Sequence, residues 1–183
     1  MTNNFDNIKI TKYLWKHDAY RYVLGTLGNA PLIFIGLNPS SATPKNPDCT
    51  YCRLNKILKN NKEFDSVILL NLYPLVATDS NDLPKELNEF HHKKNLACIK
   101  KVFKECSESN KKLNILLAWG SGIKKRKYFK DILKELRKIL SKYETNCDFY
   151  YIESKNIKYP LHPLVLPKNT KLEPKSFPIV YFS

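Results

Sequence analysis

The sequence predicts an α/β fold with three layers, α/β/α, around a central, mainly parallel four-stranded sheet. Four apolar, strand-like runs alternate with three segments of helical character. The runs are apolar throughout rather than at every second position, which is typical of parallel strands that helices cover on both faces. The predicted strands are residues 31–37, 66–72, 113–119 and 148–154.

The crossover segments between these strands have helical periodicity. It is clearest in residues 123–142, where apolar residues recur at three- and four-residue steps, at Phe129, Ile132, Leu133, Leu136, Ile139 and Leu140. Residues 48–60 and 84–106 are the other two predicted helices. In the aromatic and charged head of the chain, residues 5–30, we expect residues 20–24 to form an edge strand.

The chain has the organisation of one domain. No internal repeat, low-complexity segment or linker divides it, and 183 residues are enough to bury a sizeable core. We therefore expect a single domain over residues 1–183. Its core is expected at about residues 31–166, with extensions at 1–30 and 167–183.

The charge balance favours a polyanionic partner. Thirty-one Lys and Arg residues stand against seventeen Asp and Glu, which gives a net charge of +14. Such an excess attracts nucleic acid, so double- or single-stranded DNA is the leading partner class. The alternative is that the lysines form an ordinary solvated surface.

The start of the chain and the cysteines indicate which compartment and which cofactors to expect. The opening MTNNFDNIKI has no apolar signal core, and no apolar run approaches the roughly 20 residues that span a bilayer. We expect a cytoplasmic monomer with no membrane segment, in which the five cysteines are free thiols. Cys49 and Cys52 form one C-x-x-C with no second close pair, so we expect neither a metal nor another cofactor.

Four informative breaks follow the predicted strands. In parallel sheets, ligands bind beyond the carboxyl ends of the strands. Asn38 alone is equally well a turn residue before a proline. Two carboxamides and a histidine at one edge, however, suit a planar ligand with hydrogen-bonding edges. The turn at residues 120–122 either cradles a phosphate or only begins a helix. The four breaks are Asn38-Pro39-Ser40-Ser41, Asn71-Leu72-Tyr73-Pro74, Trp119-Gly120-Ser121-Gly122 and Leu161-His162-Pro163-Leu164.

Several common catalytic signatures are missing from the chain. It has no Ser-His-Asp order, no Walker loop and no GxGxxG fingerprint. Their absence weakens the hydrolase-triad, NTPase and dinucleotide-binding interpretations.

The same strand ends resemble motifs of the uracil-DNA glycosylase superfamily. Residues 36–39, GLNP, resemble its first motif in the G-[IM]-N-P form of the mismatch-specific and single-strand-selective branches. Residues 68–71, ILLN, are similar to the strand whose last Asn hydrogen-bonds the pyrimidine edge, and residues 117–121, LAWGS, to the third strand. Residues 162–164, HPL, resemble the second motif, H-P-S-P-L, whose His contacts the base oxygen O2. The resemblance covers residues 31–166.

A bacterial domain family of unassigned function is also similar. Its motifs are L-N-P-S-T-A, D-P-T-x-R-R, a strand ending in N-L, A-W-G and R-H-P-L-Y-L. They correspond here to LNPSSA, DCTYCR, NL, AWG and LHPLVL, in the same order. The chain departs from the glycosylase superfamily at two points. Its second motif lacks the phosphate-contacting serine, and Asn38 stands where the Q-D-P-Y-H form has its catalytic Asp.

The resemblance implies a DNA glycosylase that hydrolyses the N-glycosidic bond of a damaged or modified pyrimidine base. It would leave an abasic site, for repair or for defence against foreign modified DNA. Asn38 would place the attacking water, His162 would stabilise the departing base and Asn71 would read its edge. The alternatives are a non-catalytic module that binds nucleic acid or a modified base, and an enzyme that processes nucleosides or nucleotides.

The resemblance also implies supporting roles. Tyr51 and Tyr73 are candidates for stacking on the base, and Leu164 or Leu166 for the wedge that fills the gap left by the base. Asp48 and Arg53 are pocket candidates, with a helix cap or a structural ion pair as the alternative. The phosphate-contact candidates are Ser40, Ser41, Ser121, Lys124, Lys125 and Arg126.

Overall fold

The structure is a computed structural model that describes residues 15–17, 19–43, 45–109, 112–154 and 157–182. The strands are β1 (Trp15–His17), β2 (Tyr20–Gly25), β3 (Pro31–Gly36), β4 (Ser66–Asn71), β5 (Leu113–Leu117) and β6 (Cys147–Tyr150). The α-helices are α1 (Cys49–Asn60), α2 (Glu89–Ser109) and α3 (Phe129–Leu140). Short 3-10 helices are η1 (Ser80–Asp82), η2 (Gly120–Lys125), η3 (Glu144–Asn146), η4 (Pro163–Val165) and η5 (Ile179–Phe182).

The strands form one mixed sheet in the order β1-β2-β4-β3-β5-β6. The four predicted strands are present and mutually parallel, as β4, β3, β5 and β6. The prediction of a four-stranded sheet is wrong in number, because β2 pairs antiparallel with β4 and β1 pairs antiparallel with β2. The expected strand at residues 20–24 is confirmed as β2. It is not the edge, since β1 lies outside it.

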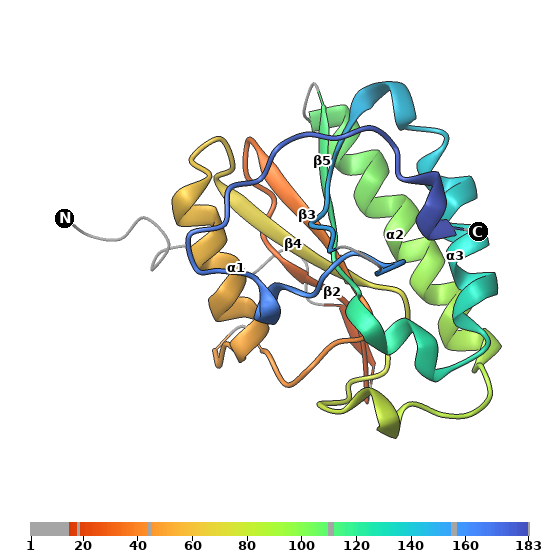
Figure 1. The fold of residues 1–183 in the computed structure, drawn as a ribbon. Helices are drawn as coiled ribbons and strands as arrows, with labels where there is room; N and C mark the ends of the chain where they lie inside the picture. The colour runs from red at the N-terminus through yellow and green to blue at the C-terminus, as the bar shows by residue number, and fades with distance from the viewer. Residues whose placement is uncertain (1–14, 18, 44, 110–111, 155–156, 183) are drawn as a thin grey trace.

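Helices cover both faces of the sheet (Figure 1). On β3, Leu32 and Phe34 face one side and Ile33 and Ile35 the other, because successive strand side chains alternate. The first pair packs with α1 through a core that includes Leu54, Ile57 and Leu58. The second pair packs with α2 and α3, and all six predicted apolar positions of α3 are buried there. The apolar periodicity of α3 and the α/β class are thus confirmed.

The helices begin later than predicted, and α2 begins at Glu89 rather than at residue 84. α1 begins one residue later than expected, because Asp48 is its N-cap. The residues ahead of α3 form η2 instead of extending the helix. No helix among the described residues is long and apolar enough to cross a membrane.

The connections around β3 create a crevice. The chain leaves β3 through α1 to reach β4 on one side, and returns through α2 to β5 on the other side of β3. Because α1 and α2 cover opposite faces, the carboxyl ends of β3 and β5 lie at a topological switch point, where open α/β sheets bind ligands. After β6 the chain brings η4 against α1 and then crosses to α3, where η5 packs (Figure 1).

Candidate functional site

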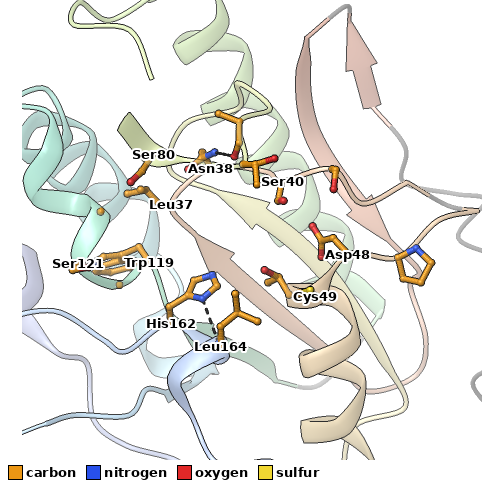
Figure 2. A pocket seen from close by; sticks show the side chains of 17 residues that line it. Leu37, Asn38, Ser40, Asp48, Cys49, Ser80, Trp119, Ser121, His162 and Leu164 are labelled. Atoms are coloured by element: carbon orange, nitrogen blue, oxygen red, sulfur yellow. Dashed lines mark hydrogen bonds between the residues drawn. The ribbon is translucent and has the colours of Figure 1, made fainter. Parts of the chain in front are cut away.

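A cleft of about 560 Å³ opens at this switch point, a volume in the range of small-molecule sites. Figure 2 shows its walls, which come from the loop after β3, the start of α1, residues 77–80 between β4 and the start of η1, the turn after β5 and the segment around η4. The structure therefore brings three of the four predicted strand-end segments together. The lining side chains include Asn38, Ser40, Ser41, Asp48, Cys49, Thr50, Trp119, Ser121, His162 and Leu164.

Asn38 is both a turn residue and a cleft residue. Its Nδ2 donates to the carbonyl oxygens of Ala77, at 2.8 Å, and Pro39, at 3.1 Å. Since only the NH₂ group can donate to two carbonyls, the orientation of the amide is fixed. The Oδ1 atom is left as the acceptor of this half-buried side chain, which lines the cleft.

His162 is held as a neutral donor. The backbone N–H of Leu164 donates to its Nδ1 over 3.3 Å, so in the neutral ring the proton is on Nε2. Burial lowers the pKa of His162, while the negative charge of Asp48 acts in the opposite direction. Because the ordinary pKa is already near 6.5, the ring is neutral at pH 7.

Gly120 lets the turn after β5 approach this histidine. Its φ is +68°, a left-handed conformation that favours glycine. A Cβ at this position would lie 3.0 Å from the Cβ of His162. The Gly120 N–H also donates to the Pro160 carbonyl at 3.0 Å, which ties the β5 turn to the segment that carries the histidine. The glycine thus brings the turn against His162, and it is also the first residue of η2.

Asp48 combines the two roles that the sequence left open. Its Oδ1 accepts the Tyr51 N–H at 2.8 Å, which caps α1, and its Oδ2 accepts the Ala42 N–H at 3.2 Å. The half-buried carboxylate also lines the cleft. It therefore orders the loop after β3 and places a negative charge near His162.

A smaller chamber of about 20 Å³ adjoins the cleft. Asn71, only 3% exposed, lines it from the end of β4. Gly36 leaves room for this side chain, because a Cβ there would lie 2.9 Å from the Asn71 Oδ1. Asn71 thus lies in the chamber rather than in the outer cleft. The two cavities share Asn38, Ser40, Asp48, Thr50 and His162.

Two buried polar residues of this region were not predicted from the sequence to belong to the site. Arg21 on β2 is 4% exposed and lines the chamber, and its Nη1 donates to the carbonyls of Ser40 and Ala42. Asn95 on α2 is fully buried and donates to the carbonyls of Asn71, at 2.8 Å, and Leu72, at 3.2 Å. Asn95 could have been found as the polar residue on the apolar face of α2. Arg21 gave no such signal, because a charged residue at a strand end reads as solvent-facing.

The DNA-contact candidates separate into two groups. Ser41 and Ser121 are exposed and Ser40 is half-buried at the cleft, while Lys124 and Lys125 are exposed on η2. Arg126 is different. Its guanidinium donates to the backbone carbonyls of Asn81, Leu83, Pro84 and Lys125, so it ties η2 to the loop around η1.

Of the candidates for the wedge and for stacking on the base, only one lines the cleft. Leu164 is 45% exposed at the cleft, whereas Leu166 is buried against α1. Tyr73 lies in the core beside Tyr128, and Tyr51 packs on the α1 face; neither lines the cleft or the chamber. The Arg53 Nη1 donates to the Leu166 carbonyl at 2.9 Å and pairs structurally with that segment rather than with Asp48.

The described cysteines are all free thiols, with Cys49 and Cys52 exposed and the other three buried. In the described ranges, no three His, Cys, Asp or Glu side chains gather where they would hold a metal ion. Burial raises the pKa of the three buried thiols, Cys98 to about 11 and Cys106 and Cys147 to about 12, so they are protonated and inert at neutral pH.

Of the comparisons with known proteins, a protein-family model gives a match, and the matched residues include the whole site. No curated protein and no solved structure matches the chain. A family model described as a protein of unknown function, DUF1643, matches residues 21–164, which include every residue that lines the cleft and the chamber. Because this match spans more than half of the sequence, the chain belongs to the DUF1643 family.

Proposed function

We propose that this protein is a DNA glycosylase that hydrolyses the N-glycosidic bond of a modified pyrimidine, and that its fold is that of the uracil-DNA glycosylase superfamily. One observation carries the proposal. The neutral His162, with its proton on Nε2, shares a switch-point cleft with Asn38 and borders the chamber that holds Asn71. A donor can stabilise the departing base, a fixed acceptor can place the water and a carboxamide can read the base edge, which together suit excision of a base.

The chemistry follows from these groups. The target nucleotide leaves the base stack and its base enters the cleft with one edge toward the adjoining chamber, where the Asn71 side chain hydrogen-bonds that edge. As the bond between the base nitrogen and C1′ breaks, its electron pair stays on the base, and His162 Nε2–H donates to the base oxygen that gains negative charge. Water attacks C1′ of the sugar and loses a proton to solvent.

Asn38 places that water instead of deprotonating it. Its Nδ2 is engaged by the carbonyls of Ala77 and Pro39, so Oδ1 is the atom available to accept a hydrogen bond from the water. A carboxamide does not titrate near neutral pH, so it cannot act as a general base. Positioning of the water and stabilisation of the leaving base therefore lower the barrier.

The surroundings of the cleft support DNA as the substrate. The chain carries a net charge of +14. Ser121 lines the cleft at the start of η2, and Lys124 and Lys125 lie exposed farther along the same short helix. Such groups contact phosphates and position the duplex without reading sequence. Leu164, 45% exposed and lining the cleft beside His162, is the candidate for the side chain that fills the stack after the base leaves (Figure 2).

Incubation with DNA tests the proposal. Oligonucleotides that each carry one modified pyrimidine, single-stranded and duplex, are treated with the protein and then with alkali to cleave abasic sites. Asn38→Ala and His162→Ala should lose the product, while Lys130→Ala, on an exposed position of α3, should retain it. Tight DNA binding without cleavage of any base would point to a binding module. Activity on free nucleosides but not on DNA would exclude DNA as the substrate.

A further inference from the structure

Two thiols at the start of α1 take no part in the proposed reaction. Cys49 is the first residue of α1 and Cys52 is the fourth, and both side chains are exposed. Cys49 also lines the cleft, next to Asp48 (Figure 2). The other three cysteines are buried, and burial keeps their thiols protonated at neutral pH. An oxidant that arrives from solvent therefore meets Cys49 and Cys52 first.

The first turn of α1 holds these two residues at a spacing that suits a bond between their sulfurs. The Cys52 N–H donates to the Asp48 carbonyl at 2.9 Å, so the turn is closed as a regular α-helix. Residues three apart lie on the same face of a helix. Their Cα atoms are about 5 Å apart, within the roughly 4.4–6.8 Å that a disulfide spans. The pair can therefore be oxidised while α1 stays folded.

A bond between the two sulfurs would change the wall of the cleft. The Cβ atoms of residues three apart in a helix are about 5–6 Å from each other, whereas a disulfide holds them at about 3.5–4.5 Å, so the first turn must tighten. Asp48 caps this turn by accepting the Tyr51 N–H at 2.8 Å. Its carboxylate lines the cleft, and its charge acts on His162. Oxidation of Cys49 and Cys52 thus reaches the site through Cys49 itself and through Asp48.

We propose that Cys49 and Cys52 form a reversible disulfide that switches the cleft off, by exchange with a low-molecular-weight disulfide such as glutathione disulfide. The thiolate of one cysteine attacks a sulfur of glutathione disulfide, whose S–S bond breaks to release one glutathione. The second cysteine then attacks the protein sulfur of the mixed disulfide and releases the second glutathione. The protein loses two electrons and two protons, and two glutathione thiols are formed. Formation of the disulfide is independent of the proposed function, whereas its effect on excision rests on that function.

Intact-mass spectrometry of the folded protein, equilibrated with excess glutathione disulfide and quenched with acid, tests the bond. The wild-type protein should lose two hydrogens and retain no glutathione, and peptide mapping should link Cys49 to Cys52. Cys98, Cys106 and Cys147 should react with an alkylating reagent only after unfolding. Cys52→Ser should stop at the mixed disulfide, with one glutathione on Cys49. A wild-type protein that stays reduced, retains glutathione or links either residue to another cysteine would overturn the disulfide.

The His162 ring resonances and the excision rate test the switch, each protein being compared with its own reduced form. In the wild-type protein, oxidation should move the proton NMR resonances of His162 and slow excision at least about tenfold, as displacement of a cleft wall by about 1 Å allows. Dithiothreitol should restore both. Cys49→Ser should keep its rate and its resonances after the same treatment, because Cys52 does not line the cleft.

The two measurements separate the switch from the glycosylase. A disulfide that forms without moving the His162 resonances, or without slowing excision by a protein that excises a base, would overturn the switch and leave the glycosylase. Resonances that move reversibly in a protein that excises no modified pyrimidine, reduced or oxidised, would support the switch and overturn the glycosylase.

Discussion

The backbone N–H of Leu164 donates to Nδ1 of His162 over 3.3 Å, so the first turn of η4 decides which ring nitrogen presents a proton to the cleft. The histidine is itself the N-cap of η4, with Pro163 at the first helical position. The proline has its φ preset and needs no hydrogen-bond acceptor there. The His-Pro-Leu segment is thus a local device that orients one imidazole, and its tautomer follows from backbone geometry.

Asp48→Asn should shift the titration of His162 to lower pH. Burial lowers the pKa of this histidine and the charge of Asp48 opposes that effect, so removal of the charge lets the pKa fall further. Asparagine caps helices as well as aspartate, so α1 should stay intact. Proton NMR of the His162 ring measures the shift, and the acid limb of the excision rate should move with it. An unchanged or raised pKa would contradict the assigned charge effect.

Gly120→Ala should destabilise the fold and displace His162. The φ of +68° disfavours any Cβ, and the added atom would lie 3.0 Å from the histidine Cβ. We expect a loss of about 1–3 kcal/mol in the free energy of unfolding, measured by urea denaturation. Ser121→Ala, at the exposed next position, is the matched control and should change stability little. Equal stability of the two variants would show that the turn tolerates a side chain.

Asn95→Leu tests whether α2 positions the end of β4. The substitution keeps the branching and the number of heavy atoms of the side chain but removes the donors to the Asn71 and Leu72 carbonyls. Leaving these carbonyls without their donor should cost about 1–3 kcal/mol of the free energy of unfolding. Base binding should weaken as well, because Asn71 loses its backbone anchor. A variant that unfolds earlier but binds nucleosides as tightly as the wild type would limit Asn95 to a structural role.

The sequence predicted the framework of this site better than its interior. The apolar runs that became β3, β4, β5 and β6 and the periodicity of α3 are local signals, so they placed Asn38 and His162 near one cleft. Arg21 and Asn95 belong to no motif, and their function depends on which backbone carbonyls lie near them in three dimensions. The same holds for Arg126, a predicted phosphate contact, because its role depends on the four backbone carbonyls that lie near it in the fold and accept its hydrogen bonds.

Lys124 and Lys125 should differ from Arg126 in how they affect DNA binding. The two lysines are exposed on η2, so the double substitution to Ala should weaken binding and reduce the slope of log affinity against log salt by about 0.9 for each phosphate that the protein no longer neutralises. Arg126→Met should leave that slope unchanged and instead lower the free energy of unfolding by about 1–3 kcal/mol, because the loop around η1 loses its tie to η2. Fluorescence anisotropy at several salt concentrations and urea denaturation measure the two effects. If Arg126→Met reduces the salt slope while stability is unchanged, its guanidinium faces DNA and leaves the carbonyls when DNA binds.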